Sequence, residues 1–336
     1  MSYSANLFKA LYSYHHKKTK VLNYPMITHI EVTNACNLSC PFCPRDRIKE
    51  RGIGYMTMET FERIVNSKNA NMLRHLRMFG HGESLLHPKL VEYVKLVRPY
   101  AKSVGLTTNV QLLTEARAKE LLEAGLDIIV FSFEGVNKEA YERMRVGGNF
   151  ETAVRNIMNF VDLRNAGGHK CRIVITCLDC KETHSGIERF VGYWSQFVDV
   201  VGHMPVHDWG GILSSPLVNM TPIETHRVCF WPWFGFDVYW NGSVAPCCMY
   251  ETDVGLGNVN DSSLTEIWNS PEYQQFRWNM LYNQDELPIC RTCRLNKLSD
   301  AYLRTVQTPN PRFPFTQSSL NLLRDGVIKI VRAPHF

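Results

Sequence analysis

Residues 31–44 read EVTNACNLSCPFCP and contain the spacing Cys36-x3-Cys40-x2-Cys43, directly after an apolar segment typical of a β-strand. Three thiolates on one short loop can bind three corners of a cubane iron–sulfur cluster and leave one iron without a protein ligand. Zinc normally takes four ligands, so three cysteines without a local fourth suit it poorly. The loop therefore predicts a cluster whose open iron can bind a cofactor or substrate, with a zinc or purely structural site as the alternative.

The composition is that of an ordinary globular protein. The 336 residues are 45% hydrophobic and 21% charged, and the formal net charge of +5 does not by itself indicate nucleic-acid binding. No apolar run approaches the roughly 20 residues of a membrane span, and residues 1–20 lack the apolar region of a signal peptide. We therefore expect a cytoplasmic protein without membrane or nucleic-acid partners. In that reducing compartment, eleven cysteines indicate metal or redox chemistry rather than disulfides.

Residues 26–215 alternate short β-rich segments with amphipathic helical segments. Six strands in such alternation predict an α/β fold with a parallel sheet and right-handed crossovers. Either an open doubly wound sheet or a partial barrel satisfies this pattern. The expected strands span 27–32, 76–79, 103–107, 128–133, 173–177 and 198–206, and the expected helices span 58–65, 88–101, 115–124, 150–165 and 185–197.

A second, smaller domain is expected over residues 216–300. A β-hairpin is predicted where two apolar segments flank the Asn241-Gly242 turn. Short helices are expected at 264–268 and after Ser270, which precedes a proline. The remaining residues are assigned to an N-terminal extension (1–25) and a C-terminal tail (301–336).

Four cysteines in this second domain can close another metal site. Cys229 precedes the hairpin, Cys247 ends it, and Cys290-x2-Cys293 follows after 42 further residues. By spacing alone, this set fits a structural zinc as well as a closed iron–sulfur cluster. Cys171, Cys177 and Cys180 are expected to be inert core residues, because cysteine is among the most buried residue types.

The two cysteine patterns resemble those of a known family. The segment EVTNACNLSCPFCP resembles the signature of the radical S-adenosylmethionine (SAM) superfamily. The pattern around the second set, with Leu-Gly-Asn-Val at 256–259, resembles the SPASM/twitch extension, in the shorter twitch form because no cysteine follows Cys293. The resemblance implies a partial (β/α)6 TIM-like barrel with a small C-terminal iron–sulfur domain, a 5′-deoxyadenosyl radical made from SAM, and a flavodoxin or ferredoxin-type electron donor.

The resemblance also implies cofactor-binding residues. Two [4Fe-4S] clusters are expected, a SAM-binding one on Cys36, Cys40 and Cys43 and an auxiliary one on Cys229, Cys247, Cys290 and Cys293. Residues 80–83 resemble the glycine-rich motif that holds the SAM amino group, with His81 in place of a glycine. Glu134 stands where an aspartate is usual in the segment that contacts the SAM carboxylate and ribose. The residues matched to SAM contacts are Phe42, Gly80, Gly82, Glu83, Asn109, Ser132 and Arg145.

The reaction expected from this resemblance is a two-electron oxidation. A closed auxiliary cluster can accept the electron left on a substrate radical, whereas a thiol such as Cys248 would return a hydrogen and epimerise the carbon. The ~25 residues before the first strand are too few for a leader-peptide-binding module, which favours a small polar, sugar- or aminocyclitol-like substrate of natural-product biosynthesis. His207 and Asp208, at the end of the sixth strand, are candidate substrate contacts. A radical epimerase, a peptide maturase, an RNA-modifying enzyme and a non-catalytic iron–sulfur or zinc protein are the alternatives.

Overall fold

The computed structural model describes residues 2–47, 51–66, 70–206, 208–213, 217, 228–250, 255–293 and 329–332. Within these residues one sheet contains nine strands in the order β8-β7-β1-β2-β3-β4-β5-β6-β9. The strands are β1 (Ile27–Ile30), β2 (His75–Met78), β3 (Ser103–Thr108), β4 (Ile128–Ser132), β5 (Arg172–Asp179), β6 (Val200–Pro205), β7 (Gly235–Val238), β8 (Val244–Ala245) and β9 (Lys329–Arg332). All neighbours from β7 to β6 are parallel, and the edge strands β8 and β9 are antiparallel.

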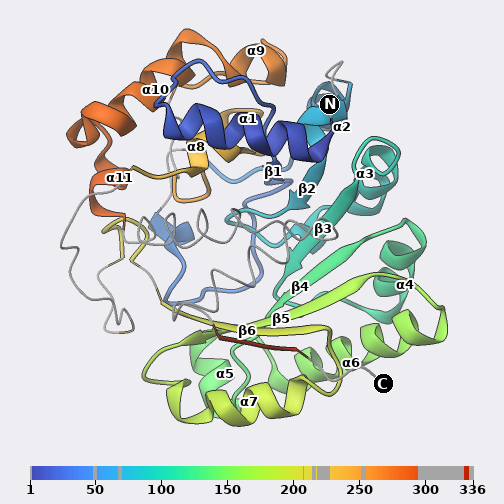
Figure 1. The fold of residues 1–336 in the computed structure, drawn as a ribbon. Coiled ribbons are helices and arrows are strands. Elements are labelled where there is room, and N and C mark those ends of the chain that lie inside the picture. The colour runs from blue at the N-terminus through green and yellow to red at the C-terminus, as the bar shows by residue number, and fades with distance from the viewer. Residues whose placement is uncertain are drawn as a thin grey trace.

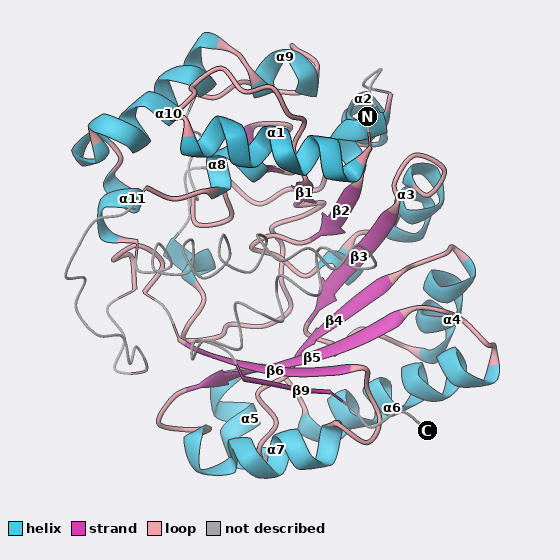
Figure 2. Cartoon of the chain, viewed as in Figure 1, coloured by secondary structure: helices cyan, strands magenta, loops and turns pink. Residues whose placement is uncertain are grey.

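The order of the strands decides between the two predicted architectures. A doubly wound sheet reverses its strand order at a switch point, but β1 to β6 are neighbours in chain order. Right-handed crossovers then place the connecting helices on one face of the sheet, which Figures 1 and 2 show as the outer layer. The sheet curls without closing, so the partial barrel is confirmed. The outer helices are α2 (Met58–Val65), α3 (Leu90–Val97), α4 (Glu115–Glu123), α5 (Lys138–Met144), α6 (Phe150–Ala166) and α7 (Ile187–Trp194).

The core lies between the sheet and these helices. Alternate strand residues such as Ile30, Met78 and Leu106 are completely buried on the outer face of the sheet. The expected caps are present: the Thr114 hydroxyl accepts the backbone N–H of Arg117 at 3.3 Å, where α4 begins. The other set of alternate side chains faces the inside of the partial barrel, and many of these are polar.

The C-terminal hairpin continues the same sheet. β7 pairs with β1 in parallel, and Gly242 makes the turn into β8 with a φ of +86°. The expected boundary at residue 216 therefore does not separate two sheets, because pairing with β7 covers an otherwise open edge of β1. The remaining helices of this part are α8 (Trp231–Phe234), α9 (Leu264–Trp268), α10 (Pro271–Tyr282) and α11 (Pro288–Thr292).

The N-terminal extension forms a helix that the sequence reasoning did not predict. α1 (Tyr3–His15) is capped by Ser2, whose hydroxyl accepts the N–H of Ala5 at 3.2 Å. The Tyr14 hydroxyl donates to the carbonyl of Val228 at 2.8 Å, and its ring packs edge-on against Trp233 of α8. The extension is thus anchored next to Cys229. Short 3₁₀ helices span Pro44–Arg47, Ala70–Leu73, Ser84–Leu86, His184–Gly186 and Gln284–Glu286.

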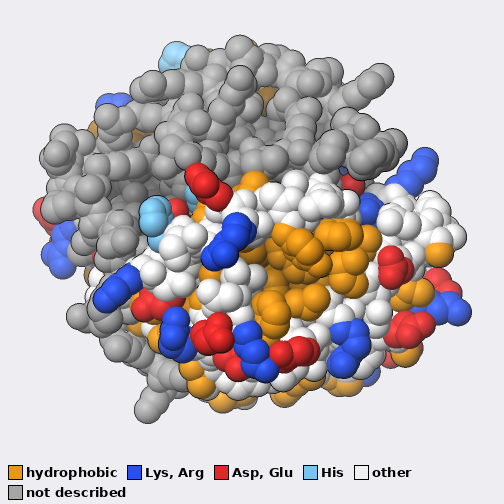
Figure 3. All heavy atoms as spheres, turned by 90° about the horizontal axis from the view of Figure 1, so that it is seen from below, with side chains coloured by type: hydrophobic (Ala, Val, Ile, Leu, Met, Phe, Trp, Pro, Cys, Tyr) orange, Lys and Arg blue, Asp and Glu red, His pale blue; other side chains and the backbone are white. Residues whose placement is uncertain are grey.

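Two features of the described residues concern membrane and nucleic-acid partners, which we did not expect from the sequence. No helix in the described ranges is long and apolar enough to cross a membrane. On the face seen in Figure 3, basic and acidic side chains are interspersed around an apolar area, so the part drawn in colour offers no continuous basic track for a phosphate backbone. Of the tail, only β9 is described; it pairs with β6.

Candidate active site at two thiol clusters

The cysteine loop follows β1 and is held in place from both sides. The Arg45 guanidinium donates to the carbonyls of Cys36 and Leu38, each at 3.1 Å. Before the loop, the Asn34 amide donates to the carbonyl of Gly52 at 2.6 Å. These bonds fix the backbone on which the three thiols are presented.

The three loop thiols lie within electrostatic range of one another and are only partly exposed. Burial raises the pKa of all three, to about 12 for Cys43; neighbouring thiolates raise it further at Cys40 and Cys43, and the charge of Glu83 does so at Cys36. The guanidinium of Arg145 opposes this shift, with Nη1 3.6 Å from the sulfur of Cys40. Such thiols stay protonated without a metal and lose their protons when a metal binds.

Arg145 connects this loop to β4. Its guanidinium lies 5.1 Å from the ring centroid of Phe42 and is paired with the buried carboxylate of Glu134. Burial alone would lower the pKa of Arg145, but the charges of Glu134 and Cys40 raise it, so the side chain stays cationic. Ser132 ends β4 at the same edge of the sheet. The structure therefore brings Phe42 and Arg145 together at the loop, with part of the Arg145 charge neutralised by Glu134.

The glycine-rich segment after β2 packs against the strand that leads into the cysteine loop. A Cβ at Gly80 would lie 2.5 Å from the side chain of Glu31, and one at Gly82 would lie 2.3 Å from the carbonyl of Thr33. Both positions therefore require glycine for contacts within the chain itself. Glu83 follows, fully buried, and accepts the backbone N–H groups of Asn109 at 2.7 Å and of Leu85 at 3.1 Å.

The Glu83 carboxylate also interacts electrostatically with the cysteine loop. Burial raises its pKa, while the backbone donors and Arg145 lower it, and its charge acts in turn on Cys36. Asn109 is closer still, with its side-chain amide 3.8 Å from the sulfur of Cys36. The structure thus gathers Glu83 and Asn109 beside the first cysteine of the loop. A carboxylate has about four lone-pair positions, so the two backbone donors and the Thr108 side chain leave room for one further donor such as an ammonium.

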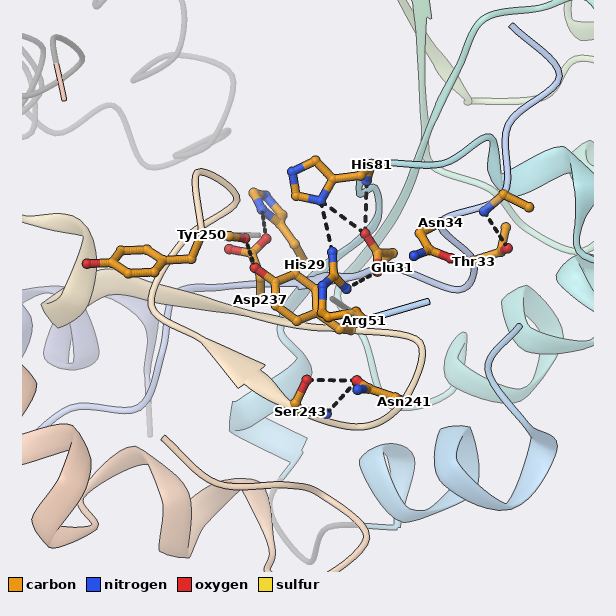
Figure 4. A network of polar contacts seen from close by, with 12 residues as sticks. His29, Glu31, Thr33, Asn34, Arg51, His81, Asp237, Asn241, Ser243 and Tyr250 are labelled. Atoms are coloured by element: carbon orange, nitrogen blue, oxygen red, sulfur yellow. Dashed lines mark hydrogen bonds and ion pairs between the residues drawn. The ribbon is translucent and has the colours of Figure 1, made fainter. Parts of the chain in front are cut away.

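Sequence reasoning missed a buried ionic group beneath the loop, seen in Figure 4. Glu31 pairs with Arg51 at 2.6 Å and accepts from the backbone and ring of His81 at 3.0 and 3.2 Å. Burial alone would raise the pKa of Glu31, but His81 and Arg51 lower it to about 2. The guanidinium of Arg51 also stacks 3.7 Å from the ring centroid of Tyr239. His81 therefore has a role here that a glycine could not fill.

This ionic group gives a prediction for stability. Replacing Glu31 with glutamine leaves the Arg51 charge buried without its counter-ion, which costs about 3–5 kcal/mol. We expect the Glu31→Gln protein to lose this free energy of unfolding in denaturant titrations at pH 7. The matched control is Glu59→Gln, because Glu59 pairs with Arg63 at 3.0 Å on the surface, where such a pair contributes about 0–1 kcal/mol. Equal losses in the two variants would contradict the proposed importance of burial.

The second thiol cluster assembles from three separate segments. Cys229 lies just before α8, Cys247 follows β8, and Cys290 and Cys293 lie in and after α11. Burial raises the pKa of Cys229, Cys247 and Cys290, and charges within this same set raise each of them further. The Tyr250 hydroxyl is 3.3 Å from the sulfur of Cys290. The fold thus brings the four predicted ligands together.

The spacing of these thiols bears on which metal they fit. Among the described residues, no three His, Cys, Asp or Glu side chains are arranged closely enough to hold a single metal ion. A tetrahedral zinc with Zn–S bonds of about 2.3 Å would place the sulfurs about 3.8 Å apart. The four thiols lie within electrostatic range of one another, a spacing from which either a zinc ion or a cubane cluster could gather them on binding.

The three residues predicted to contact the substrate or its radical are Cys248, His207 and Asp208. Cys248 is partly exposed; burial raises the pKa of its thiol, and the charges of Asp237, Cys293 and Arg77 act on it as well. His207 lies outside the described residues. Asp208 is 8% exposed, and its backbone carbonyl accepts the N–H groups of Gly211 and Leu213.

Trp209, which follows these candidates, contacts the cysteine loop. Its indole N–H donates to the carbonyl of Phe42 at 2.9 Å, and its ring lies 5.6 Å from that of His81. The three cysteines assigned to packing are indeed buried: Cys171, Cys177 and Cys180 are at most 2% exposed. A small hollow lined by residues such as His75 and Ser103 lies at the opposite, amino-terminal edge of the strands, away from the cysteine loop.

Comparison with known proteins agrees with this geometry. Residues 30–190 match the family described as the radical SAM superfamily, and residues 229–294 match the SPASM family, an iron–sulfur cluster-binding domain. The chain belongs to the radical SAM superfamily. Within it, the chain is a radical SAM enzyme that carries a C-terminal SPASM domain.

Similar proteins include a tungsten-containing aldehyde ferredoxin oxidoreductase cofactor-modifying protein from Pyrococcus furiosus, 26% identical over 81% of this chain and 88% of that protein. A PqqA peptide cyclase from Rhizobium meliloti is 27% identical over 82% of this chain and 80% of the cyclase. Among solved structures, BtrN in complex with AdoMet and 2-DOIA has a TM-score of 0.59 at 20% identity, covering 81% of this chain and 94% of BtrN. SuiB from Streptococcus suis, bound to precursor peptide SuiA, has a TM-score of 0.65 at 15% identity, covering 89% and 76%. At these identities the two structures support the fold.

Proposed function

We propose that this radical SAM enzyme oxidises an alcohol carbon of a small polar molecule by two electrons. The observation that carries the proposal is the second thiol cluster: four cysteines from three segments converge next to the polar interior of the barrel. A cluster with all four irons ligated by protein has no position for substrate, so its chemistry is electron transfer. An electron acceptor beside the substrate makes oxidation the favoured outcome.

The residues that hold the cofactors are proposed from the geometry above. When bound, SAM and the two [4Fe-4S] clusters supply a radical that removes hydrogen from carbon and an acceptor for the electron left behind. Cys36, Cys40 and Cys43 hold the first cluster, and Cys229, Cys247, Cys290 and Cys293 hold the second. Glu83 binds the SAM ammonium, and the remaining SAM contacts are assigned to Phe42, Gly80, Gly82, Asn109, Ser132 and Arg145.

The substrate class is proposed from the interior and from the relatives. The names of the relatives include both a peptide cyclase and, for BtrN, a complex with AdoMet and 2-DOIA. The inner face of the barrel presents buried polar side chains, among them His29, Glu31 and Asp237, which suit a compact hydroxylated molecule. Asp208 and His207 remain candidate substrate contacts, and a flavodoxin or ferredoxin-type protein is the proposed electron donor.

The mass of the product tests the oxidation. We expect reduced holoenzyme, given SAM and a panel of C-deuterated aminocyclitols and sugars, to transfer deuterium into 5′-deoxyadenosine. The product should be two hydrogens poorer than the substrate and should gain no solvent deuterium at carbon. The readout is mass spectrometry of both products. Turnover of peptides alone in the same assay would contradict the small-molecule proposal and identify a peptide maturase.

An epimerase is the second candidate, and the position of Cys248 favours it. This thiol interacts electrostatically with Asp237 and Arg77, and there it can donate a hydrogen atom to a substrate radical. An epimerase would give an isomer of unchanged mass that carries one deuterium from heavy water. Cys248→Ala would then stop product formation while SAM cleavage continued. If Cys248→Ala still forms the oxidised product, the thiol is not the hydrogen donor.

A further inference from the structure

Two buried side chains on neighbouring strands form a histidine–carboxylate pair inside the barrel (Figure 4). His29 of β1 lies directly opposite Asp237 of β7 in the sheet register. The ring atom Nδ1 of His29 is 2.8 Å from Oδ1 of Asp237, and the residues are 6% and 3% exposed. An ionised carboxylate only accepts hydrogen bonds, so the proton of a neutral His29 lies on Nδ1 and the lone pair of Nε2 is free.

The outward atoms of this pair have no partner. Nε2 of His29 and Oδ2 of Asp237 are both buried without a hydrogen bond among the described residues. The indole nitrogen of Trp231, whose ring lies 5.5 Å from that of His29, is unpaired in the same way. Buried polar atoms without partners are rare in native proteins, because each loses its hydration without compensation. An acceptor such as Nε2 of His29 can take the hydrogen of a hydroxyl group, and an indole N–H can donate to a hydroxyl oxygen.

The pair lies against the second thiol cluster. The ring of Trp231 covers Gly235, where a Cβ would approach it to 3.2 Å, and the backbone of Trp231 forms a hydrogen bond to the thiol of Cys229. The charge of Asp237 acts on the thiol of Cys247. A proton held at His29 is therefore close to the ligands of the proposed electron acceptor.

Other charged groups surround His29 on each neighbouring element. Arg77 of β2 is partly buried and is the partner of His29 in the sheet register on the other side. Glu31, two residues further along β1, is paired with Arg51 and His81. The thiol of Cys248 interacts electrostatically with Asp237 and Arg77. The apolar ring of Phe79 also packs near His29, with 5.3 Å between the two ring centroids. Within this set, Asp237 is the group bonded to the His29 ring.

We propose that His29 binds the hydroxyl of the substrate and accepts its proton during oxidation, with Asp237 as the residue that positions the ring. The inference rests on the proposed function and assigns to it a base that no comparison indicates. Loss of a hydrogen atom from the alcohol carbon leaves one unpaired electron there. Nε2 of His29 takes the hydroxyl proton and the C–O single bond becomes a carbonyl; an iron–sulfur cluster held by Cys229, Cys247, Cys290 and Cys293 would supply the oxidant that takes the remaining electron. One proton and one electron leave, which balances the second half of a two-electron oxidation.

The first test needs no substrate. If His29 takes up a proton when the neighbouring cluster is reduced, the midpoint potential of the auxiliary cluster falls as pH rises, by thermodynamic reciprocity. Redox titrations of the holoenzyme, followed by electron paramagnetic resonance between pH 6 and 9, should show this slope. His29→Gln keeps a polar side chain without the titration and should flatten it. A flat profile in the wild type, or an unchanged slope in His29→Gln, overturns the proposal.

The second test separates the two half-reactions. General-base catalysis contributes about 10²–10⁴-fold, so His29→Gln should lower carbonyl product per SAM cleaved by at least about 100-fold. Deuterium transfer into 5′-deoxyadenosine should persist. Asp237→Asn should give a smaller loss and shift the pH profile of product formation. His75→Gln, at a half-buried histidine on the adjacent strand β2, is the matched control and should change neither readout.

The outcomes distinguish this inference from the proposed function. Full product formation by His29→Gln, with iron content and unfolding midpoint as in the wild type, overturns the role of His29 while oxidation stands. An isomeric product in the wild type overturns the oxidation, whereas the substrate-free potential still decides whether His29 is coupled to the cluster. Loss of iron or of SAM cleavage in His29→Gln would show a structural role and overturn the catalytic one.

Discussion

Replacing Cys36, Cys40 and Cys43 together with alanine is expected to abolish SAM cleavage and to halve the iron content, from about eight to about four per chain. The three thiols are gathered on one loop whose backbone is fixed by Arg45, so the triple change removes every protein ligand of the proposed first cluster. Iron analysis and 5′-deoxyadenosine formation after anaerobic reconstitution measure both effects.

A matched control uses cysteines of the same chain. Cys171→Ala and Cys177→Ala remove buried thiols that belong to neither set of predicted ligands. Both variants should keep their iron and their SAM cleavage. Their cost is one of packing, at about 1 kcal/mol for the lost volume. SAM cleavage that survived in the triple variant would contradict the assignment of the loop.

Replacing Cys290 and Cys293 with alanine is expected to abolish product formation while SAM cleavage stays measurable. These thiols supply half of the second set, at and after α11, and do not belong to the cysteine loop. The loop keeps its own ligands and its partners Glu83, Asn109 and Arg145, so radical generation does not depend on them. The measurements are the ratio of product to 5′-deoxyadenosine and the iron content.

The identity of the metal in the second site can contradict this prediction. Elemental analysis that finds zinc in the second site of the wild type would contradict the electron-acceptor role and leave only a structural one. Because α11 packs against the 3₁₀ helix Gln284–Glu286, the variant should also be checked for its unfolding midpoint. A midpoint equal to that of Cys171→Ala would show that the loss of product does not come from a loss of fold.

The sequence was sufficient for the parts of the structure that depend on local pattern. The six barrel strands lie where alternating apolar segments indicated them, and α2 spans the predicted residues 58–65. Thr114 and Ser270 cap the helices that follow them, because a cap depends only on residues within one turn. The two cysteine sets could also be predicted, because the spacing of metal ligands can be read directly from the sequence.

The missed residues are those whose meaning depends on strand pairing. Asp237 in a strand looks like a poor β residue until β7 is placed beside β1, about 200 residues earlier, where it meets His29. Glu31 stood in the quoted motif, but its partner Arg51 comes from the following loop and His81 from the end of β2. The signal that remains in the sequence is a charged residue inside an otherwise apolar strand, which requires a partner when buried. The helix α1 was missed because its stability depends on its contact with α8.

The shared sheet has a consequence for how this enzyme can be divided or changed. Since β7 bonds to β1 residue by residue, the spacing between the two thiol clusters is set by backbone register, and no hinge separates the halves at this seam. A single-residue insertion in β7 would turn Asp237 to the opposite face of the sheet and bring its neighbour to face the interior. A truncated chain that ended before Cys229 would leave β1 as a bare edge, open to pairing with other molecules. The barrel strands and the C-terminal hairpin are therefore expected to fold as one unit.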